Sequence, residues 1–285
     1  MTKNYDEIVR DVCDTVIRAG STFREDKKTA YRKALENETS NRARWVMDTI
    51  IQNSEVAETN CSPLCDDTGI PHILLEVGTN SIITGQTIDA INDGVAMGLR
   101  KLPGRPMAIN GNESQRIDQS GGLNDDPGTL LPAPILIRRC KDDVVRLHIL
   151  MFGGGPAIRA KTYRVFHKHD TRVVLNEIVG WAIDGVSKLG CSPCTLAVGI
   201  GRSHYEATAL MLQAQVDGDY GVQSEMEREI TQRVNKTNIG PLGLGGKTSV
   251  LATFMKVGPQ RASGVRIVCM RPCCCFEPRI ASVVL

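Results

Sequence analysis

The sequence predicts an α+β fold in which N-terminal helices precede a mixed domain of helices and strands. Apolar residues recur at helical spacing over residues 5–58, and strand-length apolar runs alternate with helical stretches in the rest of the chain. Two such runs, 133–140 and 144–152, are joined by a turn-like Lys-Asp-Asp segment, which predicts an antiparallel hairpin. Because no repeat or clear linker interrupts the chain, one domain is expected over residues 1–285, with a helical N-terminal region over about 1–58.

The individual elements follow from the spacing of the apolar residues. Ile8, Val12 and Val16 recur every four residues, which is the spacing of one helix face. The polar stretch from about 103 to 130 is rich in Gly, Asn and Asp, and a loop of that length is usually functional or disordered. The expected elements, in chain order, are helices over 5–58, a strand over 73–78, a helix from about 88 that ends at Pro103 and Gly104, strands over 133–140 and 144–152, a helix around 175–189, a strand over 195–201, helices near 204–216 and 222–236, and strands around 249–257 and 264–270.

Composition excludes several classes of protein. The chain has 285 residues, of which 41% are hydrophobic and 23% are charged, with a net charge of +2. This even balance argues against a nucleic-acid or membrane-surface partner. The first residues lack the apolar core of a signal peptide, and no apolar run approaches the roughly 20 residues of a membrane span. A cytoplasmic protein is therefore expected.

Ten cysteines are unusual for such a chain. Cytosolic thiols are kept reduced, so a disulfide framework is not expected, and metal binding, redox chemistry or buried inert thiols remain. Cys13 and Cys140 lie in plain helical and strand patterns and are given no role.

Two glycine-rich segments suggest phosphate binding but fit it poorly. The segment 241–248 fails as a P-loop because the position that requires glycine is Pro241, and because a strand follows where a helix is needed. The segment Gly153–Pro156 lacks the spacing of a dinucleotide fingerprint. Its consecutive glycines suit either a backbone site for an anion or a simple bend.

The cysteine motifs leave several alternatives open. Cys191 and Cys194 form a CxxC, but a helix precedes it and a strand follows, which is the reverse of a thioredoxin-like site. A zinc site would have to combine this pair with distant cysteines, unlike standard zinc modules. Cys65, Cys191 and one of Cys273–Cys275 instead occur in three separate turn-forming segments, which suits an iron–sulfur cluster with one open iron.

At these residues the chain resembles the alpha subunit, or N-terminal domain, of the class I iron–sulfur-dependent fumarate hydratase and L-tartrate dehydratase family. The resemblance extends over nearly the whole chain, and its motifs agree in order and spacing. They are CDDTG at Cys65–Gly69, a PxR segment at Arg105, Gly153–Gly155, the C-x₆-VGIG segment Cys191–Gly201, IGPLGLGGKT at Ile239–Thr248, and Cys275-x-x-x-Arg279.

The resemblance implies a set of site residues. Cys65, Cys191 and Cys275 would be the metal ligands of a [4Fe-4S] cluster, and adjacent Cys274 or Cys273 stays open as the third ligand. Asp67, with its neighbour Asp66, would lie at the catalytic centre and contact the substrate hydroxyl. The substrate-binding residues would be Arg105, Gly154, Gly155 and Lys247, with Arg105 holding a carboxylate through its guanidinium.

The resemblance also implies an activity and a partner. The chain would hydrate or dehydrate a small 2-hydroxy (di)carboxylic acid or enoate, such as malate/fumarate, tartrate or a relative. The open iron would act as a Lewis acid at the C2 hydroxyl, and a separate beta subunit would supply the base for the C3 proton. A hetero-oligomer or a homodimer of alpha subunits is expected.

Two residues depart from the family pattern. Asp66 replaces a glutamine, and Phe254 replaces a histidine that assists at the substrate hydroxyl in relatives. Because these changes add a negative charge and remove an imidazole, a different or more apolar 2-hydroxy acid is a reasonable hypothesis. The alternative function is a non-catalytic iron–sulfur- or zinc-binding protein derived from the same family.

Overall fold

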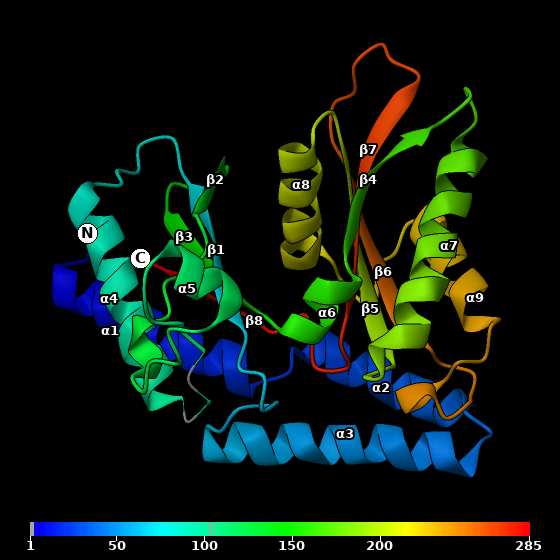
Figure 1. Ribbon diagram of the computed structural model, residues 1–285, viewed down its shortest axis with the longest axis horizontal. Helices are drawn as coiled ribbons and strands as arrows, with labels where there is room; N and C mark the ends of the chain where they lie inside the picture. The colour runs from blue at the N-terminus through cyan, green and yellow to red at the C-terminus, as the bar shows by residue number, and fades with distance from the viewer. Residues whose placement is uncertain (1–2, 103, 106) are drawn as a thin grey trace. The chain divides into compact units, whose positions relative to one another are not determined.

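The computed structural model describes residues 3–102, 104–105 and 107–285 (Figure 1), so the predicted helix end at Pro103 lies outside the described residues. The chain divides into two compact units. Unit 1 consists of Met1–Phe23, Ser54–Gly153 and Arg279–Leu285, and unit 2 consists of Arg24–Asn53 and Gly154–Pro278. The sequence expectation of one family domain over 1–285 stays a prediction.

Unit 1 contains a four-stranded mixed sheet in the order β2-β1-β3-β8. Strand β1 is parallel to β2 and antiparallel to β3, and β8 pairs antiparallel with β3. The elements of unit 1 are α1 (Tyr5–Ser21), β1 (Ile70–Val77), α4 (Gly85–Lys101), α5 (Glu113–Asp118), η1 (Pro127–Thr129), β2 (Leu136–Arg139), β3 (Val145–Phe152) and β8 (Ile280–Val284).

Helices α1 and α4 pack together within unit 1 because glycines allow close approach. A side-chain carbon on Gly94 would lie 2.6 Å from Cβ of Val12, and one on Gly98 would lie 2.6 Å from Cβ of Val16. The predicted apolar face of α1 is therefore buried as expected, and it joins Ile73 and other residues of β1 and β3 in one core. The Asn4 side chain and Glu7 form a capping box that starts the helix.

The predicted hairpin between residues 133–140 and 144–152 is wrong. The two segments do form strands, β2 and β3, but β1 lies between them and pairs with both. The central residues of β1, Ile73–Leu75, are fully buried, whereas β2 alternates between half-buried and exposed residues. A strand buried on both faces occupies the sheet centre, and the short β2 is left at the edge.

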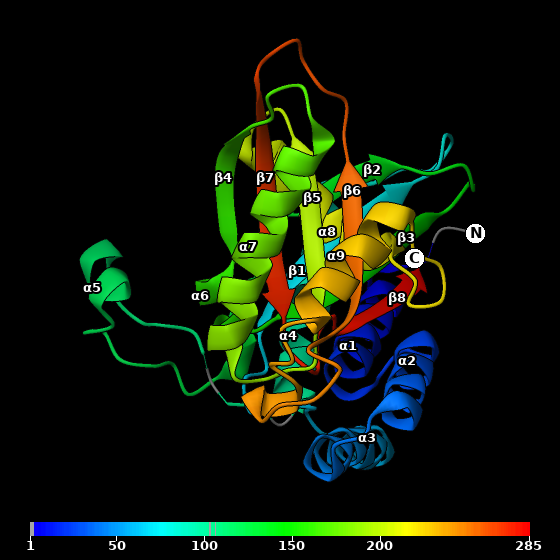
Figure 2. The same cartoon turned by 90° about the vertical axis from the view of Figure 1, so that its right-hand side faces the viewer.

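Unit 2 contains a second four-stranded sheet in the order β4-β7-β5-β6. Helices α7 and α9 cover one face and α8 lies on the other (Figure 2). Its elements are α2 (Glu25–Asn37), α6 (Gly154–Arg159), β4 (Lys161–Phe166), α7 (Thr171–Leu189), β5 (Cys194–Gly201), α8 (His204–Asp217), α9 (Glu225–Asn235), η2 (Pro241–Gly243), β6 (Val250–Val257) and β7 (Val265–Cys273), while α3 (Asn41–Asn60) contributes residues to both units.

The VGIG motif has a packing role in unit 2. A side-chain carbon on Gly199 in β5 would lie 2.0 Å from the carbonyl oxygen of Ala207 in α8. Glycine is therefore required for α8 to lie directly on the strand. Part of the family motif that follows Cys191 thus maintains the fold.

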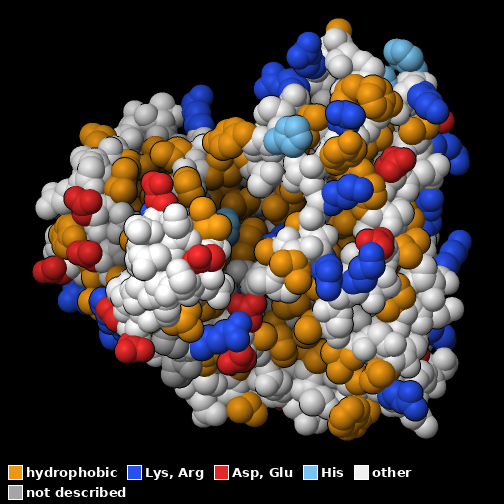
Figure 3. Space-filling model, viewed as in Figure 1, with side chains coloured by type: hydrophobic (Ala, Val, Ile, Leu, Met, Phe, Trp, Pro, Cys, Tyr) orange, Lys and Arg blue, Asp and Glu red, His pale blue; other side chains and the backbone are white. Residues whose placement is uncertain are grey.

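Strands β4 and β8 were not anticipated from the sequence, but the α+β class with antiparallel pairs is confirmed. Strand β4 is an edge of its sheet, and Lys161 and Arg164 on this strand lie near the ring of Tyr163. Figure 3 shows Lys and Arg side chains mixed with hydrophobic ones over this part of unit 2. Charges on an edge strand discourage pairing with another chain. Among the helices that the structure describes, none combines the length and apolarity that crossing a membrane requires.

Candidate functional site

Cys65 lies in unit 1, in the turn that leads from α3 to β1, and it is half-buried. The turn is anchored by the backbone N–H of Leu64, which donates to the carbonyl of Gly20 at 2.9 Å. Gly69 at the end of the motif has φ of +87°, and a side-chain carbon there would lie 2.6 Å from Nη2 of Arg279. Only glycine fits this backbone and this space, so the glycine of CDDTG has a structural cause.

The buried side chain of Arg279 holds the same turn through a hydrogen bond to its backbone. Its side chain is 2% exposed, and its Nη1 donates to the carbonyl oxygen of Asp67 at 2.7 Å. The sequence motif Cys275-x-x-x-Arg279 did not indicate that this arginine contacts the Cys65 turn. A buried guanidinium requires polar partners, but the sequence alone does not identify them.

Asp66 and Arg105, two predicted site residues, lie together in unit 1. Nη1 of Arg105 is 3.1 Å from Oδ2 of Asp66, and both side chains are more than half exposed. An exposed ion pair of this kind contributes only about 0–1 kcal/mol. The guanidinium can therefore exchange Asp66 for another carboxylate at small cost.

The predicted glycine site lies at the start of the second segment of unit 2, Gly154–Pro278. Gly154 and Gly155 are exposed at the start of α6, and a side-chain carbon on Gly155 would meet nothing within 4 Å. Packing within the protein therefore does not require glycine at position 155. Without a side chain, however, the backbone there is open to an approaching group.

Cys191 and Cys275 lie on adjacent loops of unit 2. Cys191 is exposed and follows Gly190, which ends α7 in the left-handed conformation with φ of +77°. The backbone N–H of Cys275 donates to the carbonyl of Cys191 at 2.7 Å. Two predicted ligands far apart in the sequence are thereby joined by a direct backbone hydrogen bond.

The glycine-rich segment 239–248 supports the Cys191 loop. Oγ of Ser192 donates to the carbonyl of Gly240 at 2.6 Å, and the N–H of Leu242 donates to the carbonyl of Ser192 at 2.9 Å. Gly240 has φ of +71°, and a side-chain carbon on it would lie 2.1 Å from the backbone of Gly245. The most distinctive family motif is thus a brace for a cysteine loop, and not a phosphate cradle.

Lys247, predicted to bind substrate, is tied to the end of α2. Its N–H donates to Oε2 of Glu38 at 2.7 Å, and its Nζ donates to the carbonyl of Asn37 at 3.1 Å. Glu38 is 3% exposed and accepts several backbone hydrogen bonds, which outweigh its burial and lower its pKa.

The three adjacent cysteines have different surroundings. Sγ of Cys273, at the end of β7, is 3.4 Å from Oε1 of Gln215 and is fully buried. Cys275 is the one whose backbone contacts the Cys191 loop. A hydrogen bond with Cys274, and then burial, raise the pKa of the Cys275 thiol well above its usual value. The geometry favours Cys275 over Cys273 as the partner of Cys191.

Buried charges surround this cysteine cluster in unit 2. Lys27 is 0% exposed and donates from Nζ to the carbonyl of Glu277 at 2.8 Å. Burial lowers the pKa of Lys27 to about 8, although the neighbouring thiols and the Glu277 carboxylate act to raise it. Nη2 of Arg271 forms an ion pair with Oε2 of Glu277 at 3.1 Å, and both side chains are at most 4% exposed. None of these charges was predicted from the sequence.

The two cysteines of the CxxC motif differ in burial. All ten are free thiols, and Cys194 is completely buried, with a pKa raised by burial. The CxxC motif therefore combines one exposed and one core cysteine, which does not form a redox pair.

Phe254, at the position where the resemblance implies a histidine, is a core residue. It is 1% exposed in β6, packs edge-on against Tyr220 with ring centroids 4.9 Å apart, and faces Gly218. A side-chain carbon on Gly218 would lie 2.3 Å from the Phe254 ring. The departure from the family is matched by a close-packed apolar pocket.

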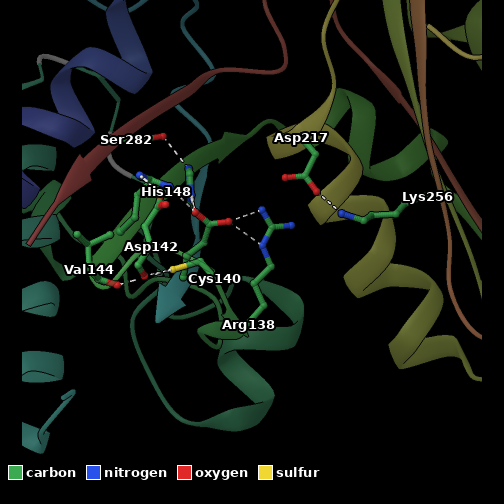
Figure 4. A network of polar contacts seen from close by, with 10 residues as sticks. Arg138, Cys140, Asp142, Val144, His148, Asp217, Lys256 and Ser282 are labelled. Carbon is green, nitrogen blue, oxygen red and sulfur yellow. Dashed lines mark hydrogen bonds and ion pairs between the residues drawn. The ribbon is translucent and has the colours of Figure 1, made fainter. Parts of the chain in front are cut away.

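A second buried charge network lies in unit 1 (Figure 4). Glu76, 8% exposed, accepts from Arg138 at 2.6 Å and from Arg146 at 3.0 Å, and its Oε2 is 3.3 Å from Nε2 of His148. Burial opposes ionisation of Glu76, but these hydrogen bonds win and lower its pKa. His148 also contacts Oγ of Ser282 at 2.7 Å. The strand predicted over 73–78 includes Glu76, but the sequence did not identify the partners of its carboxylate.

The largest cavity described, about 480 Å³, lies in unit 2 and contains none of the predicted residues. It is lined by the ends of β5 and β6 and the starts of α7 and α9, whereas Cys191 directly precedes the start of β5. Cys191 and Cys275, the two predicted ligands in unit 2, are thus at the opposite end of its sheet from this cavity. Taken separately, neither unit contains, among its described residues, three or more His, Cys, Asp or Glu side chains grouped to hold a metal ion.

Comparison with known proteins agrees with the motifs. A family model described as fumarate hydratase (Fumerase) matches residues 9–283. "Putative L(+)-tartrate dehydratase subunit alpha" of Methanocaldococcus jannaschii is 26% identical over 275 residues, which cover 92% of this chain and 94% of that protein. The resemblance inferred from the sequence is confirmed.

Two further relatives differ in length. "Putative fumarate hydratase class I" of Geobacillus stearothermophilus is 26% identical over 273 residues, covering 89% of this chain but only 50% of that protein. "L(+)-tartrate dehydratase subunit alpha" of Escherichia coli K12 is 20% identical over 258 residues, covering 87% of this chain and 82% of the relative.

Proposed function

The chain belongs to the fumarate hydratase family of hydro-lyases, and from this premise we propose that it is the subunit that carries a [4Fe-4S] cluster. It acts with a separate beta subunit on a small 2-hydroxy (di)carboxylic acid such as malate, tartrate or a relative. The observation that carries the proposal is the 2.7 Å hydrogen bond from the N–H of Cys275 to the carbonyl of Cys191, which joins two ligand-bearing loops.

The donor set fits the cluster chemically. Thiolates are the ligands that iron–sulfur clusters require, and Cys65, Cys191 and Cys275 supply three of them from turns that are braced by glycines and buried side chains. A bound cluster would supply Lewis-acid chemistry at the substrate hydroxyl, which leaves as water.

The other residues bind and orient the substrate. Arg105 exchanges its exposed Asp66 partner for a substrate carboxylate, because the pair it gives up is weak. The backbone at exposed Gly154 and Gly155 approaches a second acidic group, and Asp67, fixed through its carbonyl by Arg279, faces the hydroxyl. These contacts supply orientation, which is a large part of the catalytic effect.

A beta subunit is proposed because two of the relatives are named as alpha subunits and because the chain covers half of the Geobacillus relative. It would contribute the base that removes the C3 proton. Cytoplasmic location is proposed from the ten free thiols, which persist in a reducing compartment.

The test is anaerobic purification with the beta subunit, followed by iron and sulfide analysis and assays with malate, fumarate and tartrate. Cys65→Ser, Cys191→Ser and Cys275→Ser are each expected to abolish the cluster and the activity. Cys140→Ser is the matched control, because the Sγ of Cys140 donates to the backbone carbonyls of Asp142 and Val144 in its own turn, away from the predicted ligands. Arg105→Ala should keep the cluster and lose about 10- to 100-fold in kcat/KM, the effect of one charged hydrogen-bond donor.

Two outcomes would contradict the proposal. A colourless zinc protein without activity would favour the non-catalytic alternative. Loss of the cluster in Cys194→Ser with retention in Cys191→Ser would show that the ligands are assigned wrongly, because Cys194 is a core residue.

A further inference from the structure

Helix α2 places two buried polar side chains against the turn that carries Cys275. Lys27 and Tyr31 are one helical turn apart, on the same face, and both are 0% exposed. Nζ of Lys27 donates to the carbonyl of Glu277 at 2.8 Å, and the Tyr31 hydroxyl donates to the carbonyl of Cys275 at 2.7 Å. The ammonium group of Lys27 and the hydroxyl of Tyr31 thus both hold this turn from α2.

A fully buried lysine is costly unless negative charge compensates it. In the same turn, Nη2 of Arg271 contacts both carboxylate oxygens of Glu277, at 3.1 and 3.2 Å. Lys27 itself contacts a carbonyl oxygen of the ligand turn. The three thiols of Cys273–Cys275 lie in the same neighbourhood and act on the charge of Lys27.

We infer that Lys27 is a positioning residue that supplies the counter-charge for the thiolates of the cluster and holds the Cys275 turn in place. The inference rests on the proposed cluster, whose three thiolates bring net negative charge to this turn. Tyr31 only holds the turn in place, because its hydroxyl donates a hydrogen bond to the carbonyl of Cys275 without adding charge. Lys27 therefore affects both cluster retention and reduction potential, whereas Tyr31 affects retention only.

The experiment compares Lys27→Met, Lys27→Gln and Tyr31→Phe in the reconstituted complex. Lys27→Gln keeps a donor for the carbonyl of Glu277 and removes the charge, so it separates charge from hydrogen bonding if Lys27→Met does not fold. Lys33→Met, on the exposed face of the same helix, is the matched control. The readouts are the rate of cluster loss to a chelator, the midpoint potential of the cluster, and the difference in Tm between loaded and cluster-free protein.

Both Lys27 variants are expected to lose the cluster about tenfold faster or more, the equivalent of one charged contact. Their midpoint potential should become more negative, because a nearby cation stabilises the added electron. The gain in Tm on loading should shrink, whereas a purely structural lysine would lower both Tm values equally. Tyr31→Phe should speed cluster loss without moving the potential, and Lys33→Met should match the wild type.

If the wild-type protein takes up the cluster and Lys27→Gln shows the same midpoint potential and the same cluster lifetime, the inference about Lys27 is wrong and the proposed function still stands. A wild-type protein that takes up no cluster would instead remove the proposed function, and the inference with it.

Discussion

Each unit holds a charged network around a buried carboxylate, and the networks differ in what lies beside them. In unit 1 the guanidinium groups of Arg138 and Arg146 pair with Glu76, and burial keeps His148 towards its neutral form. In unit 2 the Arg271–Glu277 ion pair and Lys27 lie beside three thiols. The first network serves the fold, whereas the second lies beside the thiols for which we propose a cluster.

The largest effect is expected from Glu277→Gln in unit 2. It removes the carboxylate that pairs with Arg271 and leaves buried positive charge, which costs about 3–5 kcal/mol of unfolding free energy. Urea unfolding of the variant against wild type measures this, with exposed Glu36→Gln on α2 as the control. A loss no larger than that of the control would mean that the pair does not stabilise unit 2.

The variant Phe254→His tests whether the core of unit 2 tolerates a polar ring. The ring is buried against Tyr220 and Gly218, so an imidazole there should cost about 2–4 kcal/mol and should not raise the activity. Thermal unfolding and the hydratase assay check both parts, with Phe254→Leu as the apolar control. A stable, more active variant would indicate that the family's histidine role is still available in this chain.

Glu76→Gln in unit 1 should cost less, about 1–3 kcal/mol, because its arginine partners are partly exposed to water. The variant keeps the shape of the side chain and removes only the charge. Urea unfolding is the measurement, and cluster content should stay at the wild-type level. A variant that folds normally but loses the cluster would contradict the purely structural role given to this network.

The smallest effect concerns pH. Burial lowers the pKa of His148 below its usual 6.5, although Glu76 acts to raise it, so the unfolded chain binds the proton more readily than the folded one. Stability is then fully present above about pH 6.5 and is lost as the pH falls from there through the folded pKa. His148→Gln should flatten this dependence in urea unfolding between about pH 7.5 and 5.5, while the exposed His204→Gln should leave it unchanged.

The fold class was predictable because helical and strand periodicities are strong local signals. The apolar face of α1 and the strand of β5 needed no tertiary information. Strand order was not predictable in this way. The segment between β2 and β3 is short enough for a hairpin, but the apolar strand β1 lies between them and pairs with both.

The candidate site was predictable where the motifs are continuous in the sequence. CDDTG and C-x₆-VGIG led to the Cys65 and Cys191 loops, and glycine in a motif suggests the positive φ angles that Gly69 and Gly240 adopt. Lys27, and the contact of Arg279 with Asp67, were missed because both side chains act on residues remote in the chain, through a carbonyl group. Contacts with backbone carbonyls leave no pattern of residue types.

Mössbauer spectroscopy of protein reconstituted with ⁵⁷Fe, recorded with and without substrate, tests the central claim most directly. Ligation by Cys65, Cys191 and Cys275 predicts one iron subsite whose signal changes when substrate binds, while the other subsites stay constant. A cluster in which every iron keeps its signal under turnover conditions would contradict the account, because all of its irons would then be fully ligated by the protein.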